Sequence, residues 1–163
     1  MSEIDDVSRA LGEACVLGKT TVATAESCTG GGVGEAITRT PGASAWFDRG
    51  FVTYSNDAKV DLLGVKQETI GSFGAVSEAV AREMAVGALH QSSAEFAVAV
   101  TGVAGPDGGT SSKPVGLVWF AWASLDGKVE TRFEIFGGDR AAIRGQAVLE
   151  ALKGLVAIVA TAG

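Results

Sequence analysis

The sequence has little of several residue types on which common functional sites depend. Its 163 residues include one histidine, two cysteines and three prolines. His90 falls at the end of a predicted helix, where side chains are exposed by default, so a Ser-His-Asp triad does not suit this chain. Cys15 and Cys28 lack the spacing of metal ligands and are too few for a disulfide framework, which favours a reducing compartment.

The chain also lacks a basic cluster, a long apolar run and a recognisable leader. Its net charge of −6 argues against an electrostatic grip on nucleic acid or anionic lipid. The longest apolar run, "GLVAIVATAG", has about half of the roughly 20 residues that a membrane helix needs. The acidic amino terminus has no signal-peptide core. We therefore expect a cytoplasmic protein with no nucleic-acid or membrane partner, folded as a single domain over residues 1–163.

Hydrophobic periodicity and turn signals predict alternating helices and strands, followed by a late hairpin at Asp126-Gly127. A mixed sheet with helices on both faces, an α/β fold, accounts for this order. The predicted helices cover residues 4–17, 33–40, 56–63, 77–90 and the segment from Asp139 nearly to the carboxyl end. The predicted strands cover residues 20–25, 46–55, 95–100, 117–124 and 129–136.

The segment "AESCTGG" places Ser27 and Cys28 where a buried strand passes into a helix. Unpaired backbone N–H groups and the helix dipole at such a junction favour an anion, either a phosphate or the oxyanion of acyl transfer. The glycines at positions 30–32 allow a substrate to approach the backbone. An ordinary tight turn with Ser27 or Thr29 as the helix N-cap explains the same residues.

A nucleophile at this turn needs a proton acceptor, and Lys59 is a candidate. It falls in the first turn of the predicted helix 56–63, where the dipole and burial both lower a lysine pKa. Lowering the usual value of about 10.4 by roughly three units costs about 4 kcal/mol, which only a desolvated site imposes. Tyr54 is placed to relay the proton or to hold Lys59. The alternative is a solvated lysine at an ordinary strand-to-helix junction.

Two further segments suggest where a ligand lies. The loop "TGVAGPDGG" follows an apolar strand, so its backbone donors and the Thr101 hydroxyl should emerge at a sheet edge. In "GGDRAAIRGQ", Arg140 and Arg144 share one helical face and suggest a clamp for phosphate or carboxylate. Alternatively, the glycine-rich loop is merely flexible, and the two arginines form surface salt bridges.

Five motifs, in the same order, resemble the CinA carboxy-terminal family, the nicotinamide-nucleotide amidases of PncC type. They are "AESCTGG", "VTYSNDAK…LLGV", "GAVSEAVAREMA", "VAVTGVAGPDGGTSSKPVG" and "GDRAAIR", and they span about residues 20 to 155. The resemblance implies a three-layer α/β/α sandwich and an amidohydrolase without metal or cofactor. Its reaction would convert nicotinamide mononucleotide to nicotinic acid mononucleotide and ammonia in NAD recycling. The resemblance also suggests a homo-oligomer.

Carried over by motif, the resemblance makes Ser27 the nucleophile, Lys59 its general base and Tyr54 an assisting hydroxyl. The motifs do not decide which of the two arginines binds substrate, so both are included. Gly32 stands where the family usually has a larger apolar residue, and we expect it to loosen the start of the helix. The expected substrate-binding residues are Cys28, Thr29, Gly30, Gly31, Asn56, Thr101, Gly102, Gly105, Arg140 and Arg144.

Two alternatives remain open at this point. The same turn and arginines would suit a non-catalytic module that only binds a nucleotide. An amidase with Cys28 as nucleophile, assisted by Lys59 or Glu26, is the other alternative. Because adjacent side chains at a strand end point in opposite directions, we expect Ser27 to face the site and Cys28 to pack against the sheet.

Overall fold

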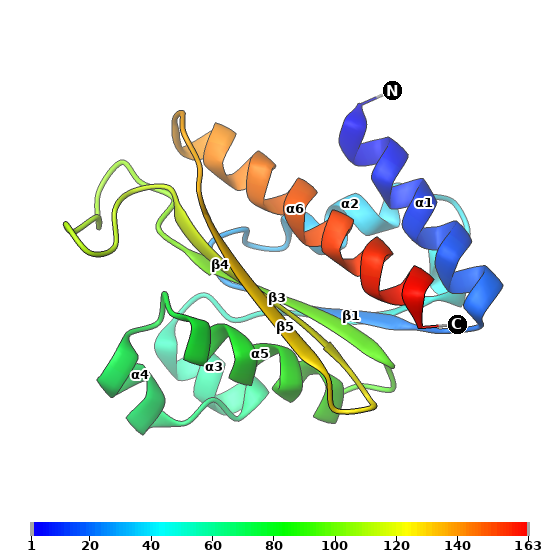
Figure 1. Cartoon of the computed structure of the whole chain (residues 1–163), viewed down its shortest axis with the longest axis horizontal. Coiled ribbons are helices and arrows are strands. Elements are labelled where there is room, and N and C mark those ends of the chain that lie inside the picture. Colours follow the sequence, from blue (N-terminus) through cyan, green and yellow to red (C-terminus); the bar gives the residue numbers. More distant parts are fainter. Residues whose placement is uncertain (1, 163) are drawn as a thin grey trace.

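The computed structural model describes residues 2–162 and contains one five-stranded sheet with helices on both faces (Figure 1). The strand order is β2-β1-β3-β4-β5. The strands are β1 (Val22–Glu26), β2 (Phe47–Val52), β3 (Phe96–Gly102), β4 (Leu117–Ser124) and β5 (Val129–Ile135). The helices are α1 (Glu3–Gly18), α2 (Gly32–Thr38), α3 (Asn56–Leu63), α4 (Gln67–Phe73), α5 (Glu78–His90) and α6 (Arg140–Thr161), with a 3₁₀ turn at Ala43–Ala45.

The sheet is mixed, as the sequence pattern predicts. Strand β1 runs parallel to β2 and to β3, whereas β3, β4 and β5 form an antiparallel meander. Glu26, the last residue of β1, lies opposite Val52 of β2 and Val100 of β3. The carboxyl ends of β1, β2 and β3 therefore lie side by side at one end of the sheet. Open α/β sheets bind ligands at the carboxyl ends of their strands.

The two faces of the sheet differ in side-chain size because successive strand residues point to opposite faces. Valine, phenylalanine and tryptophan side chains form the core with α1, α2 and α6. Alanine side chains face α5 and its neighbours α3 and α4 on the other side (Figure 1). The alanines are Ala23, Ala25, Ala97, Ala99, Ala121 and Ala123. Because both faces are covered, the central strands β3 and β4 carry no charged residue, and the predicted layers are confirmed.

The structure differs from the sequence prediction in two short elements. The predicted strand 46–55 is shorter and ends at Val52, because residues 53–55 turn away to begin α3. Helix α4 was not predicted, since none of its residues is buried and it leaves no apolar periodicity. Among residues 2–162, no helix combines the length and the hydropathy required to cross a membrane.

Two glycines of α6 offer a matched test of the packing against the sheet. An added Cβ at Gly154 would lie 2.0 Å from the Trp122 ring, whereas one at Gly145 would have no atom within 4 Å. We expect Gly154→Ala to lower the free energy of unfolding by about 1–3 kcal/mol through overpacking. Gly145→Ala should raise it by up to about 1 kcal/mol, the helix-propensity difference. Urea titration of both variants measures this; equal effects would contradict the packing.

Candidate active site

The Ser27 turn is fixed to the end of the parallel strands by main-chain hydrogen bonds. The Ser27 N–H donates to the Val100 carbonyl at 2.9 Å, and the Thr53 N–H donates to the Glu26 carbonyl at 2.8 Å. Gly30 and Gly31 follow with φ angles of 58° and 102°, in the left-handed region that favours glycine. The turn therefore reverses sharply and leads directly into α2.

Lys59 reaches this turn from α3, on the other side of the sheet from α2. Its Nζ lies 3.0 Å from Ser27 Oγ, 2.9 Å from the Thr53 carbonyl oxygen and 3.1 Å from the Tyr54 carbonyl oxygen. Only 1% of Lys59 is exposed. Ser55 caps α3 by accepting from the Ala58 N–H, which directs the first helical turn toward the sheet edge.

Burial lowers the pKa of Lys59, because a charged amine loses its hydration in this position. A neutral amine has two N–H donors and one lone pair. The carbonyls of Thr53 and Tyr54 can take the two donors, which leaves the lone pair for the Ser27 hydroxyl. The arrangement can therefore remove a proton from Ser27.

Cys28 lies on the opposite side of the turn. Its side chain is 5% exposed and packs in the core shared with α2 and α6. Burial raises the pKa of the Cys28 thiol to about 12. The side chain therefore has neither the access nor the ionisation that a thiol nucleophile needs. Cys28 was expected to bind substrate, but with its side chain buried it could do so only through its backbone.

Glu26 occupies the helix N-terminus that the sequence analysis assigned to a substrate anion. Its buried carboxylate accepts from the Thr29 hydroxyl at 2.5 Å, the Val33 N–H at 2.9 Å and the Gly34 N–H at 3.0 Å. The Val33 and Gly34 amides are therefore not open to a substrate anion, because the chain supplies its own. The Thr29 hydroxyl is also committed to Glu26. A lone acid ending an uncharged strand was the sequence signal for this role.

The two arginines of α6 have different surroundings. Arg140 donates to the Gly105 carbonyl at 2.6 Å and to the Tyr54 hydroxyl at 3.0 Å. It also lines a cavity of about 460 Å³ between the glycine-rich loop and the start of α6. Arg144 instead donates to the carbonyls of Cys28 and Thr29, both at 3.1 Å. Arg140 thus faces a cavity, whereas Arg144 holds the turn that carries Ser27.

Tyr54 contributes to the site mainly through its backbone. Its carbonyl contacts Lys59, whereas its exposed side chain reaches Arg140 through the hydroxyl. No hydrogen bond joins that hydroxyl to Ser27 or Lys59 within residues 2–162. Of the two roles considered for Tyr54, holding the lysine fits this geometry and a direct proton relay does not.

The other predicted substrate-binding residues differ in how accessible they are. Thr101 is 1% exposed and its hydroxyl donates to the Ala75 carbonyl at 2.9 Å, so the expectation that it emerges at the sheet edge was wrong. Gly102 is held against β4, since an added Cβ would lie 2.8 Å from the Leu117 carbonyl oxygen. Asn56 is exposed at the start of α3 and keeps its side chain available.

Gly32 does not loosen the start of α2 as expected. An added Cβ there would lie 3.0 Å from Val148 Cγ2, so a side chain of α6 already fills the space. The absence of a side chain at position 32 is thus matched by close packing of α2 on α6.

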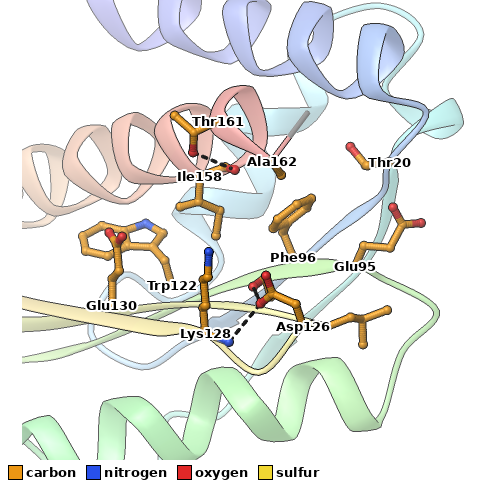
Figure 2. Close-up of a pocket in the computed structure, with 12 residues that line it drawn as sticks. Thr20, Glu95, Phe96, Trp122, Asp126, Lys128, Glu130, Ile158, Thr161 and Ala162 are labelled. Carbon is orange, nitrogen blue, oxygen red and sulfur yellow. Dashed lines mark hydrogen bonds between the residues drawn. The ribbon is translucent and has the colours of Figure 1, made fainter.

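A separate cavity of about 340 Å³ opens at the opposite end of the strands, between the β4–β5 hairpin and the end of α6 (Figure 2). Phe96, Trp122, Asp126 and Thr161 are among its lining residues. None of the predicted site residues lines it. His90, exposed at the end of α5, is likewise remote in the fold from the Ser27 edge. The candidate chemistry therefore belongs to the carboxyl ends of β1 and β3.

Comparison with known families identifies the family to which the chain belongs. The family model described as the CinA C-terminal domain matches residues 4–159, a range that contains Ser27, Lys59 and both arginines. The chain belongs to the CinA C-terminal domain family. The family predicted from the five motifs is thus confirmed.

Curated relatives within this family carry an enzymatic name. The chain is 54% identical over 154 residues to the nicotinamide-nucleotide amidohydrolase PncC of Escherichia coli strain K12, covering 94% of this chain and 93% of the relative. It is 53% identical over 157 residues to the PncC of Pseudomonas putida, covering 96% and 97%. Both relatives are thus named as amidohydrolases of a nicotinamide nucleotide.

Solved structures agree on the fold. The competence/damage inducible protein CihA from Agrobacterium tumefaciens superposes with a TM-score of 0.93 at 49% identity, over 97% of this chain and 96% of that one. The competence damage-inducible protein A from Klebsiella pneumoniae gives a TM-score of 0.94 at 37% identity, over 99% and 100%. The predicted α/β architecture is therefore that of the CinA superfamily.

Proposed function

We propose that this protein hydrolyses the carboxamide of nicotinamide mononucleotide, releasing nicotinic acid mononucleotide and ammonia for NAD recycling. The observation that carries the proposal is the 3.0 Å contact between Ser27 Oγ and the buried Lys59 Nζ. A buried amine beside a hydroxyl activates a nucleophile, a chemistry that amide hydrolysis requires. Two relatives, which this chain matches over 93% and 97% of their own length, bear the name of that amidohydrolase.

In this reaction, neutral Lys59 takes the proton of Ser27 as Oγ attacks the carboxamide carbon. The carbonyl oxygen becomes an oxyanion in the tetrahedral intermediate. Lys59 then returns the proton to the departing nitrogen, ammonia leaves, and an ester on Ser27 remains. Water, deprotonated by Lys59, attacks this ester; the pyridine carboxylic acid is released and Ser27 regains its proton. Lys59 thus serves as base and acid in both halves of the reaction.

Arg140 is our choice for the phosphate ligand of the substrate. It lines the cavity beside the glycine-rich loop, and its partners are a carbonyl and a hydroxyl, neither of which carries a charge. A phosphate bound there would exchange these neutral acceptors for a charged one, which strengthens the hydrogen bonds. Asn56 extends from the start of α3 and is available for the ribose or the pyridine amide.

The alternatives from the sequence fit these contacts less well. A module that only binds nucleotides has no use for a desolvated lysine beside a serine, since burial of the amine destabilises the fold. An amidase with a thiol nucleophile conflicts with the buried Cys28 and its raised pKa. The cytoplasmic location, the homo-oligomeric state and the single-domain organisation stay predictions.

An assay of ammonia release tests the function directly. We expect the unaltered protein to release ammonia from nicotinamide mononucleotide. Ser27→Ala should lose at least about three orders of magnitude in kcat, or about 4 kcal/mol, while the nucleotide still raises its melting temperature. Cys28→Ala, the matched control one residue away, should stay within about tenfold of the unaltered kcat. Thermal stabilisation by the nucleotide without any ammonia release would favour the binding module instead.

The pH dependence of kcat tests Lys59 as a neutral base. Below its pKa the amine is protonated and has no lone pair, so kcat should rise with pH and level off once the amine is neutral. Because burial lowers that pKa, the acid limb should lie well below the value of about 10.4 for free lysine. Lys59→Arg should be nearly inactive at every pH, since a guanidinium cannot give up its proton. Substantial turnover in Lys59→Arg would exclude the role.

Steady-state kinetics of Arg140→Ala test the phosphate contact. Its KM for nicotinamide mononucleotide should rise about 10- to 100-fold, equivalent to roughly 1.5–3 kcal/mol for a charge-assisted bond. The effect should disappear for nicotinamide riboside, which lacks the phosphate. Arg132→Ala is the control, because Arg132 pairs with Glu150 on the outer surface. An equal loss on both substrates would show that Arg140 supports the glycine-rich loop instead.

A further inference from the structure

The guanidinium of Arg144 contacts the turn that carries Ser27. Its Nε donates to the Cys28 carbonyl at 3.1 Å and its Nη2 donates to the Thr29 carbonyl at 3.1 Å. The fork geometry of a guanidinium suits two neighbouring carbonyls, and the side chain stays charged at any ordinary pH. An added Cβ at Gly30 would lie 3.4 Å from Nη2, so the turn is closed tightly over the guanidinium. Arg144 therefore fixes two consecutive peptide groups.

The first of these peptide groups joins Cys28 to Thr29. A trans peptide is planar, so its N–H points away from its carbonyl. Because Arg144 holds the Cys28 carbonyl from α6, the Thr29 N–H points away from α6. Helices α6 and α3 lie on opposite faces of the sheet (Figure 1). The Thr29 N–H is thus directed toward the side from which Lys59 reaches Ser27 Oγ.

The Thr29 N–H has no acceptor within residues 2–162. The Gly30 N–H is taken by the Ser27 carbonyl at 3.0 Å, and those of Val33 and Gly34 are taken by Glu26. The N–H groups of Cys28 and Gly31 also have no acceptor within residues 2–162, but only the Thr29 N–H belongs to the peptide whose carbonyl Arg144 Nε holds. Thr29 is also 1% exposed. Backbone donors that are buried without a partner are rare in proteins, so this one points to a ligand atom as its acceptor.

We infer that Arg144 is a positioning residue, which holds the Cys28–Thr29 peptide so that the Thr29 N–H donates to the oxyanion formed when Ser27 attacks. The inference rests on the proposed amidase function and gives Arg144 a role distinct from phosphate binding. The positive guanidinium at the carbonyl end also polarises the peptide and strengthens its N–H as a donor. Glu26 braces the same residue from the core by accepting from the Thr29 hydroxyl.

Kinetics of Arg144→Ala and Arg144→Lys test this role. Arg144→Ala should lower kcat about 10- to 100-fold, with KM for nicotinamide mononucleotide within about threefold, because the contact matters only when the oxyanion forms. Arg144→Lys should recover part of the loss, since one ammonium keeps the charge but not the fork. Arg39→Ala is the matched control: Arg39 pairs with Glu35 and Asp5 on the outer side of α2 and should leave kcat unchanged.

Chemical rescue separates positioning from a general loss of structure. Guanidinium chloride at about 20–50 mM should raise the kcat of Arg144→Ala at least about threefold by occupying the vacated site, whereas equal sodium chloride should not. The same addition should not rescue Ser27→Ala or raise the kcat of Arg39→Ala. An Arg144→Ala variant with unchanged kcat would overturn the inference, and so would a rise in KM alone.

Hydrogen exchange distinguishes this inference from the proposed function. If the unaltered protein releases no ammonia from the nucleotide, the amidase proposal fails, and exchange of the amides in residues 26–34 still tests the positioning. These amides should exchange at least about threefold faster in Arg144→Ala than in Arg39→Ala, because the turn opens more readily. Equal exchange in the two variants would mean that Arg144 does not hold the turn.

Discussion

The burial of one lysine amine is the constraint on which the site depends. Lys59 is 1% exposed, and its amine is accommodated only because two carbonyls and the Ser27 hydroxyl receive it. Those carbonyls belong to the segment that follows β2, so the parallel pairing of β1 with β2 brings Ser27 next to the carbonyls that hold the Lys59 amine. Desolvation, which would be a liability elsewhere, lowers the pKa of this amine and so favours the neutral form that a general base needs.

The turn around Ser27 is held by charges of both signs, placed on opposite kinds of backbone group. Glu26 satisfies N–H donors at the start of α2, while Arg144 satisfies carbonyls just before it. Glu26 is buried and Arg144 is half-buried, and each forms hydrogen bonds with backbone groups rather than an ion pair with the other. Ser27 thereby lies on a loop in which the Val33 and Gly34 N–H groups and the Cys28 and Thr29 carbonyls already have partners in the described part of the chain, whereas the Thr29 N–H does not.

The layers and the mixed sheet could be predicted because the order of helices and strands is readable from hydrophobic periodicity. The proximity of Ser27 and Lys59 could be predicted because both lie in motifs that resemble those of the family. The sequence could not separate Arg140 from Arg144, since both occupy one helical face and differ only in what the loops bring near them. It also misplaced the Thr101 hydroxyl, which depends on the approach of Ala75 from a distant segment. Long-range contacts of loops are the part that local patterns do not encode.

The alanine face of the sheet sets the distance between the sheet and the helices on that side. Helix α5 rests on methyl groups, and α3 in turn rests so closely on α5 that a Cβ at Gly87 would lie 1.9 Å from the Leu63 carbonyl oxygen. Lys59 stands at the other end of this stack. The distance between the Lys59 amine and Ser27 therefore depends on how closely α5 and α3 pack on these alanines. Replacing the alanines by valine or leucine during evolution would move the helices away from the sheet and change that distance without altering Ser27 or Lys59.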